Sequence, residues 1–281
     1  IQNVCIATMR ALEMTNVARF DGFVTKSGEV IIIDSNPLSG MAPSSFLFRQ
    51  ACEIGMGHAE LINHLIKTEL KNYNISRQVT EMNDQKKIKI AVLFGGASNE
   101  KEISLESGRN VCYKLSPQKY EVVPVFVSSD MQLYQIPHKL LVCTSTKELT
   151  SRLSEAQLTP WSSLKSIAEF VFLALHGGQG ENGVVQGTLE MLEIPYNGPS
   201  IFASALCMDK FKTGQFLKAK GFDVPQAFLL AKKDFENKNF NALDQFLKQI
   251  QFPCIVKPHD DGCSVMVASP KNKEELFESL H

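Results

Sequence analysis

IAVLFGGASNEKEISLESG, residues 90–108, indicates the fold class of this chain. An apolar run ends in two glycines, and Asn99 and Glu102 then stand at capping-box spacing, so the segment predicts a buried strand, a tight turn and a helix. Glycines after a parallel strand let backbone approach a ligand, and the helix N-terminus favours an anion. The segment is neither a Walker A nor a GxGxxG motif, so a plain strand-to-helix turn is the alternative.

The same alternation of strand and helix continues beyond this segment. Near-continuous apolar strands separated by helices indicate an α/β fold, with a parallel sheet covered on both faces. Further strands are expected at 119–128, 171–175 and 253–258, and helices at 104–115, 209–222 and 271–281.

Composition excludes several classes of protein. The 281 residues are 44% hydrophobic and 21% charged, which is ordinary for globular domains. A formal charge of −1 gives no basic field for nucleic acid or an anionic membrane, and no apolar run approaches the roughly 20 residues of a membrane span. Seven scattered cysteines without CxxC spacing indicate a reducing compartment and disfavour a zinc site.

The first part of the chain has a different texture. It opens IQNVCIATMR, which has the pattern of the middle of a helix and suggests a fragment or a processed piece. Helical spacing recurs in SFLFRQACEIG (45–55) and HAELINHLIKTEL (58–70). The polar, unperiodic residues 71–87 that follow are the best candidate for a linker.

RFDGFVTKSGEVIIIDSN, residues 19–36, predicts a hairpin with metal-binding potential. If Ser27-Gly28 is a two-residue loop, Asp21 faces Asp34 and Arg19 faces Asn36, with all four side chains on one face. Opposed like charges destabilise a ladder, and oxygen ligands at this separation suit a hard cation such as Mg²⁺. The alternatives are a solvated hairpin and a register one residue away.

Three further residues have positions that suggest binding. His176 stands where an apolar strand enters a glycine-rich loop that also holds Glu181, so its imidazole can donate to a carboxylate or phosphate. Lys257 closes another apolar run before a small-residue loop, which is a phosphate-clamping arrangement, and Lys210 is a second candidate cation. A structural histidine and two surface lysines are the alternatives.

Together these segments resemble D-alanine–D-alanine ligases of the ATP-grasp superfamily. IAVLFGGASNEKEISLESG, LHGGQGENGVVQGTLEMLEIPYNG, SALCMDK and PCIVKP...GCSV stand in the family's order, while RFDGF and DSNPLSGMAPSS resemble its C-terminal end. The chain thus resembles the C-terminal end of one ligase module joined to the N-terminal half of a second. The resemblance implies a doubly wound parallel-sheet N-terminal ligase domain plus partial ATP-grasp domains of α+β type. The implied divisions are 1–72, the linker 73–87, 88–208 and a truncated central domain 209–281.

The resemblance also implies cofactors and metal and phosphate contacts. ATP and Mg²⁺ (or Mn²⁺) are the expected cofactors, with the metal on Asp21, Asp34 and Asn36. Arg19 matches the arginine that stabilises charge on the transferred group. The expected ATP-binding residues are Lys210, Lys257 and Ser264.

Other positions match the family's substrate and catalytic residues. The backbone N–H of Gly40 matches an oxyanion-hole donor. Ser45 and Phe46 fall where the carboxylate of the second D-alanine is held. Glu100 matches the glutamate on the first substrate's ammonium, and His176 the histidine near that substrate. Cys263 stands where a serine orients the catalytic network.

Four departures from the family pattern affect the expected activity. Asp34 replaces the usual glutamate, and Ser39-Gly40 the usual Pro-Gly. Cys263 and Met266 stand in the loop that normally reads Gly-Ser-Ser-Val-Gly. The segment with the adenine hinge, another lysine and the substrate-loop tyrosine does not follow His281.

The expected function is the ATP-dependent joining of two D-alanines through a D-alanyl phosphate, for peptidoglycan precursors. In the leading interpretation the two parts of the chain belong to two different active sites. The alternatives are a circularly permuted ligase whose residues 1–70 fold back onto 88–281, a degenerate non-catalytic module, and a ligase that uses D-lactate. The expected partners are the small molecules D-alanine and ATP, and the chain is expected to form a homodimer if it assembles. The expected location is the cytoplasm, or an organelle for a precursor with an upstream targeting segment.

Overall fold

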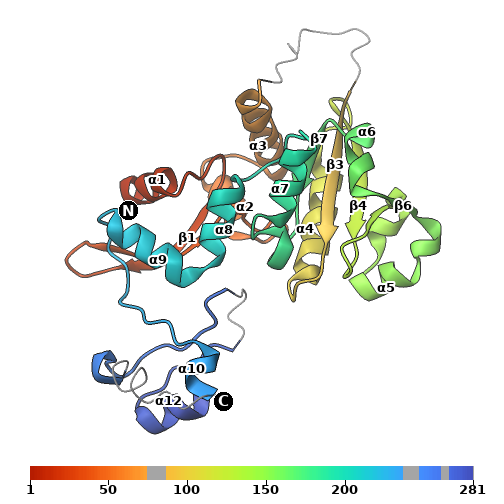
Figure 1. Ribbon diagram of the computed structural model, residues 1–281. Helices are drawn as coiled ribbons and strands as arrows, with labels where there is room; N and C mark the ends of the chain where they lie inside the picture. The colour runs from red at the N-terminus through yellow and green to blue at the C-terminus, as the bar shows by residue number, and fades with distance from the viewer. Residues whose placement is uncertain (75–86, 237–246, 261–265, 281) are drawn as a thin grey trace.

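The computed structural model describes residues 1–74, 87–236, 247–260 and 266–280 (Figure 1). The α-helices are α1 (Gln2–Ala11), α2 (Phe46–Glu53), α3 (His58–Asn72), α4 (Lys101–Lys114), α5 (Thr146–Ser151), α6 (Leu164–Ile167), α7 (Val184–Met191), α8 (Ile201–Met208), α9 (Lys210–Ala219), α10 (Lys232–Glu236) and α12 (Lys273–Ser279). The strands are β1 (Arg19–Val24), β2 (Val30–Asn36), β3 (Ile88–Gly95), β4 (Tyr120–Val127), β5 (Leu133–Gln135), β6 (Gln157–Thr159) and β7 (Phe170–Leu173). Short 3₁₀ helices lie at His138–Val142, Leu153–Glu155, Trp161–Ser163 and Gly178–Gly180.

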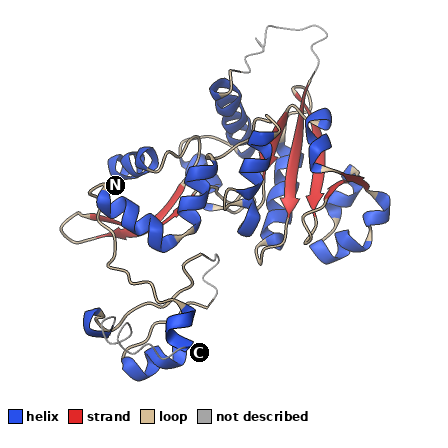
Figure 2. Ribbon diagram, in the orientation of Figure 1, coloured by secondary structure: helices blue, strands red, loops and turns tan. Residues whose placement is uncertain are grey.

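A five-stranded sheet forms the centre of the larger part (Figure 2). Its strand order is β6-β5-β4-β3-β7; β3 runs parallel to both β4 and β7, whereas β5 and β6 are antiparallel to their neighbours. The α/β class expected from the sequence is therefore confirmed. β5 and β6 were not predicted, because a three-residue strand is too short to show a hydrophobic pattern in the sequence.

Both faces of this sheet are covered, as the unbroken apolar strands predicted. Ile90, Val92 and Phe94 of β3 belong to the core formed with α2, α3 and α4. The alternate residues Ala91 and Leu93 belong to a second core, which includes buried side chains of α6 and α7. Alternation along β3 thus divides one apolar strand between two cores.

The hairpin β1–β2 confirms the outer register predicted from the sequence. Arg19 pairs with Asn36, and Asp21 with Asp34. The turn differs from the prediction, because the Thr25 amide donates to the Glu29 carbonyl at 2.9 Å across a three-residue loop rather than a two-residue one. A β-bulge beyond Asp21 adds one residue on β2 and restores the predicted pairing at the open end.

A third core joins the hairpin to helices distant in sequence. Ile32 of β2 and Leu12, just after α1, are buried with Ala203 and Cys207 of α8 and Leu217 of α9. The Ile32 amide also donates to the Asp223 carbonyl at 3.0 Å. Residues 1–72 are therefore packed against the segment 88–224, and the predicted linker residues 75–86 lie outside the described residues.

After Asp223 the chain runs to a small lobe with α10 and α12 (Figure 1). The strand predicted at 253–258 is wrong: in the part of the chain that the structure describes, Val256 forms an isolated antiparallel bridge with Ala268, and the Cys254 amide donates to the Pro270 carbonyl at 3.1 Å. Pro258 and Pro270 have no N–H to donate, so the hydrogen bonding on either side of the bridge is incomplete.

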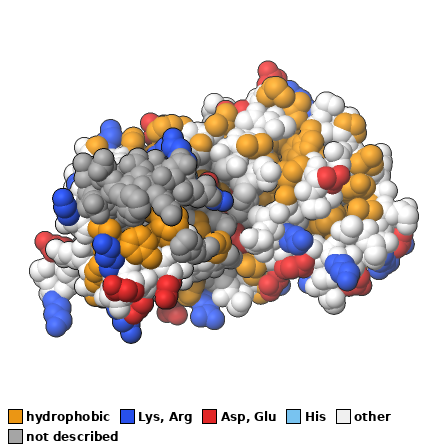
Figure 3. Space-filling model, turned by 60° about the horizontal axis from the view of Figure 1, so that its bottom comes forward, with side chains coloured by type: hydrophobic (Ala, Val, Ile, Leu, Met, Phe, Trp, Pro, Cys, Tyr) orange, Lys and Arg blue, Asp and Glu red, His pale blue; other side chains and the backbone are white. Residues whose placement is uncertain are grey.

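Among the described residues, no helix is long and apolar enough to span a membrane. On the face turned forward in Figure 3, acidic and basic side chains are interspersed, in keeping with the formal charge of −1.

Candidate functional site

Residues 1–72 and the segment 88–224 meet at a buried hydrogen-bonded chain of three residues. The His176 imidazole Nε2 lies 2.9 Å from Ser107 Oγ. The Met41 amide donates to the same oxygen at 3.1 Å. His176, Ser107 and Met41 are all buried, so this chain lies inside the junction between the two segments.

The loops after β3 and β7 come together beside His176, at one end of these hydrogen-bonded residues. The Ser98 hydroxyl donates to the His176 carbonyl, and the Glu100 amide donates to Ser98 Oγ at 3.1 Å. A Cβ added at Gly177 would lie 3.1 Å from Glu100 Oε2, so the Glu100 carboxylate lies beside the glycine after His176. The predicted first-substrate residues Glu100 and His176 are thus neighbours, since the carboxyl ends of parallel strands meet at one edge.

On the other side lies the loop before α2, with the other predicted substrate residues. Ser45 is the N-cap of α2, and its buried Oγ has no hydrogen-bond partner among the described residues. A Cβ added at Gly40 would lie 3.7 Å from Ser45 Cβ, so these two residues are adjacent. Phe46 is 67% exposed, with the Arg49 guanidinium 5.9 Å from its ring centroid.

At the open end of the hairpin, three of the predicted residues converge. Arg19 Nη2 donates to Asp21 Oδ2 at 3.3 Å, and Asn36 Nδ2 donates to the same oxygen at 3.4 Å. Arg19 Nε is buried and has no hydrogen-bond partner in the part of the chain that the structure describes. The arginine therefore keeps a donor available for a further anion.

Asp34 connects the hairpin with α9. Lys210 Nζ lies 3.6 Å from Asp34 Oδ2, and both side chains are about four-fifths buried, with 18% and 22% exposed. Burial, together with the Asp34 carboxylate, raises the pKa of the nearby Cys207 thiol to about 12. The thiol is therefore neutral near pH 7 and does not compete with the carboxylates for a cation.

The donors at the open end of the hairpin fit a hard divalent cation. Asp21 and Asp34 stand opposite each other, and Asn36 adds an amide next to them. Mg²⁺ is commonly held by one or two carboxylates together with water and substrate phosphate, which this set allows. No cluster of three or more His, Cys, Asp or Glu with metal-binding geometry occurs among the described residues.

The remaining predicted ATP residues stand in or beside the small-residue loop of the C-terminal lobe. Lys257 is exposed, and the carbonyl of the nearby His259 accepts the Lys210 amide at 2.7 Å, so the residues just before this loop contact the start of α9. Cys263 and Ser264 lie outside the described residues. Met266 is 80% exposed and has φ +56°, a left-handed conformation that favours glycine.

The sequence analysis missed Ser107, Met41 and Asn110. Ser107 and Asn110 are buried on one face of α4, where a polar residue among apolar positions was the only available signal. Met41 contributes main-chain atoms, so its role leaves no trace in residue type.

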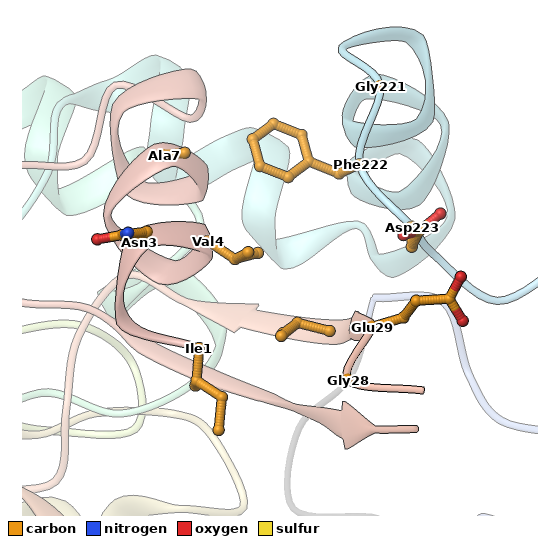
Figure 4. A pocket seen from close by; sticks show the side chains of 10 residues that line it. Ile1, Asn3, Val4, Ala7, Gly28, Glu29, Gly221, Phe222 and Asp223 are labelled. Carbon is orange, nitrogen blue, oxygen red and sulfur yellow. The ribbon is translucent and has the colours of Figure 1, made fainter. Parts of the chain in front are cut away.

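An open groove of about 490 Å³ lies elsewhere, between α1, the hairpin turn and residues 221–223 (Figure 4). Val4, Val30 and Phe222 give it an apolar lining, with Glu29 and Asp223 at its edge. None of the predicted site residues lines it.

Two family models match the chain. The model described as D-ala D-ala ligase N-terminus matches residues 89–199. The model described as D-ala D-ala ligase C-terminus matches residues 1–67 and 216–281, on either side of the first. The two models together cover most of the chain, with C-terminal-model residues before the N-terminal ones.

Individual proteins and structures agree with these matches. A D-alanine–D-alanine ligase of Bacillus anthracis is 34% identical over 193 residues, covering 69% of this chain and 52% of that protein. One from Leptospira interrogans is 36% identical over 201 residues, covering 68% of this chain and 56% of that protein. The crystal structure of the VanG D-Ala:D-Ser ligase from Enterococcus faecalis has a TM-score of 0.60 at 25% identity, covering 69% of this chain and 59% of that one. The chain spans about half the length of the curated relatives it matches.

Proposed function

This chain belongs to the D-alanine–D-alanine ligase family, and we propose that it serves the ATP-dependent joining of two D-alanines through a D-alanyl phosphate, which supplies peptidoglycan precursors. The observation that carries the proposal is the meeting of both substrate segments. His176 contacts Ser107, and Ser107 contacts Met41, which follows the proposed oxyanion donor Gly40. Residues for both D-alanines therefore face one junction.

The first D-alanine would bind beside the loop after β7. The Glu100 carboxylate, next to Gly177, pairs with the substrate ammonium, and His176 lies close to the substrate. An ionised carboxylate forms a short, charge-assisted hydrogen bond with an ammonium group. The substrate carboxylate would then attack the γ-phosphate of ATP, and the D-alanyl phosphate forms as the P–O bond to ADP breaks and ADP leaves.

The second D-alanine would bind at the N-terminus of α2. Ser45 Oγ has no hydrogen-bond partner among the described residues, and a rotation of this side chain out of its buried position would let it donate to a substrate carboxylate. The first N–H groups of a helix favour the same negative charge. The amine of this D-alanine, after losing a proton, would attack the acyl carbon, while the Gly40 N–H donates to the oxygen that becomes negative. The bond from that carbon to the phosphate oxygen then breaks and inorganic phosphate leaves.

Lysines and the arginine would stabilise phosphate charge. Lys210 and Lys257 are the proposed contacts to the ATP phosphates, and the free Nε of Arg19 is placed to donate to the transferred group. Asp21, Asp34 and Asn36 would hold Mg²⁺ or Mn²⁺, which when bound neutralises triphosphate charge.

The packing also bears on how the site is assembled. The leading interpretation from the sequence placed the two parts of the chain in two different active sites. The approach of Asp34 and Lys210 to within 3.6 Å supports the folding back considered in the second interpretation. We propose one composite site from residues 1–72, residues 88–224 and Lys257; the tandem arrangement of modules and the four domain divisions stay predictions.

A degenerate, non-catalytic module is the second candidate, and one observation favours it. Met266 has φ +56° where the family loop carries glycine, so a side chain stands where backbone should close over phosphate. Replacing it in this chain (Met266→Gly) and measuring ATP affinity tests this candidate. A large gain in ATP affinity would mean that the present loop is impaired, whereas no gain would remove its support.

Calorimetric titration with D-alanine tests the proposed function directly. We expect saturable binding that Glu100→Gln weakens at least tenfold, with L-alanine as the ligand control and Glu106→Gln, on an exposed face of α4, as the variant control. Absence of D-alanine binding, or equal binding by Glu100→Gln, would contradict the proposal.

A second assay addresses the reaction and its acceptor. Phosphate release and dipeptide formation are followed with ATP, Mg²⁺ and D-alanine, and then with D-lactate added as the competing acceptor. We expect D-alanine to be preferred. Turnover by this chain would support the composite site and would contradict two separate, incomplete sites. Sedimentation of the same sample tests the homodimer.

A further inference from the structure

Ser107 differs from other buried hydroxyls of α4 in what it contacts. Ser104, one turn earlier, accepts from the Gly95 amide at 2.8 Å and donates to the Ala174 carbonyl at 2.7 Å, so it joins only neighbouring strands of the central sheet. Ser107 instead contacts His176 after β7 and Met41 in the loop before α2. Its partners therefore belong to two segments that are far apart in sequence.

Two hydrogen bonds meet at the Ser107 hydroxyl. The Met41 amide can only donate, so it occupies one lone pair of Ser107 Oγ. His176 Nε2 lies 2.9 Å from the same oxygen, and the imidazole tautomer decides which of the two groups donates. In either direction, this one hydroxyl links the two segments.

A second α4 residue holds the same point of the loop. Asn110 Nδ2 donates to the Met41 carbonyl at 2.8 Å, so α4 contacts both main-chain polar groups of Met41. Gly40 precedes Met41, and its N–H is the proposed oxyanion donor. The orientation of that N–H depends on the peptide held by α4, since consecutive peptide planes share a Cα atom.

We propose that Ser107 is a positioning residue that sets the two substrate subsites against each other, through its hydrogen bonds to His176 and Met41. The names of the subsites rest on the proposed function, but the contacts do not. Ser107 is fully buried, which leaves substrate no access to its hydroxyl and excludes a role as nucleophile. Its effect passes through His176 and through the peptide next to Gly40.

Three alanine variants on α4 separate this role from simple packing. Ser107→Ala breaks both links, Asn110→Ala frees Met41 on one side only, and Ser104→Ala removes a buried hydroxyl with no partner in either subsite. The readouts are the imidazole nitrogen chemical shifts of His176, hydrogen exchange of the Met41 amide, and the affinity for D-alanine.

The three variants should give three different patterns. In Ser107→Ala we expect shifted His176 nitrogen resonances, faster Met41 exchange and about tenfold weaker D-alanine binding. Asn110→Ala should alter the loop but leave the His176 resonances unchanged. Ser104→Ala should leave all three readouts as in the wild type. A Ser107→Ala protein with wild-type His176 resonances and D-alanine affinity would overturn the proposal.

A conservative variant keeps the test decisive if Ser107→Ala does not fold. Ser107→Cys retains a weak donor and acceptor of similar shape, so we expect the same changes at smaller size; wild-type values would again overturn the inference. The proposed function has its own test: it is contradicted if the wild-type chain does not bind D-alanine. In that case the His176 resonances and Met41 exchange still decide whether Ser107 joins the two segments.

Discussion

Lys210 Nζ lies 3.6 Å from Asp34 Oδ2, and this contact joins the start of α9 to the hairpin strand β2. The two residues are separated by most of the chain, including residues 75–86 outside the described part. A lysine on one segment thus neutralises a carboxylate on the other. The proposed metal and phosphate residues are therefore adjacent without further rearrangement of the chain.

This ion pair should couple the two segments energetically. In a double-mutant cycle of Asp34→Asn and Lys210→Met, we expect about 1 kcal/mol of coupling in the free energy of unfolding by urea. The more exposed pair of Lys89 and Glu121, 3.4 Å apart, should give less than about 0.5 kcal/mol. Equal coupling energies in both cycles would contradict the inference that the Asp34–Lys210 contact stabilises the packing of the two segments more than an exposed ion pair does.

The hairpin carboxylates should control divalent-cation binding. We expect Asp21→Asn and Asp34→Asn each to weaken Mn²⁺ binding in the presence of ATP at least tenfold, because each removes a charged oxygen ligand. Electron paramagnetic resonance of free Mn²⁺ measures this affinity. Glu29→Gln at the turn of the same hairpin is the matched control, since its carboxylate contacts only Thr25 and Ser27 in the described structure. Wild-type affinity in both aspartate variants would rule out this metal site.

Two helical glycines should respond to alanine with opposite signs. A Cβ at Gly108 of α4 would lie 2.4 Å from Phe94 Cβ, so Gly108→Ala overpacks a buried contact and should cost about 1–3 kcal/mol. At Gly214 of α9 nothing lies within 4 Å of the added Cβ, so Gly214→Ala should stabilise the chain by about 0.5–1 kcal/mol. Thermal unfolding compares the two. A stabilising Gly108→Ala would mean that α4 and β3 are less closely packed than described.

A buried glutamate at the junction should make stability depend on pH. Burial raises the pKa of Glu69, which is only 2% exposed. The folded state thus favours the neutral acid, and the stability gained from it is complete below the ordinary pKa of 4.5 and lost as pH rises through the folded value. The groups that face Glu69 are Asn16, Asn72, Tyr73, Tyr196 and the Gly198 amide.

Removing this carboxyl group tests the sign. We expect Glu69→Gln to unfold at a higher temperature than the wild type at pH 7, with the difference shrinking towards pH 4, because glutamine is never charged. Glu53→Gln, at an exposed position of α2, should follow the wild type at every pH. A lower unfolding temperature of Glu69→Gln at pH 7 would show that the ionised form is the stabilised one.

The part of the candidate site that lies on the hairpin could be predicted from the sequence, because its residues are close together along the chain. The pairings of Asp21 with Asp34 and of Arg19 with Asn36 were predicted from a two-residue loop at Ser27-Gly28, and they are confirmed although the loop has three residues. The loop and the bulge that produce this register could not be predicted, because their effects cancel at the open end of the hairpin. The role of Ser107 could not be predicted, because the sequence does not show whether a buried serine contacts strands, as Ser104 does, or the substrate loops.

The sequence alone determined the α/β class, the helices α2, α3, α4, α9 and α12, the strands β3, β4 and β7, and which residues stand at the carboxyl ends of β3 and β7. These depend on hydrophobic period and on glycine positions, which act within a few residues. Only the tertiary structure decided that residues 1–72 lie against 88–224, and that His176, Ser107 and Met41 form one chain. Such contacts depend on which apolar faces fit one another best, a comparison between distant surfaces that no local pattern contains.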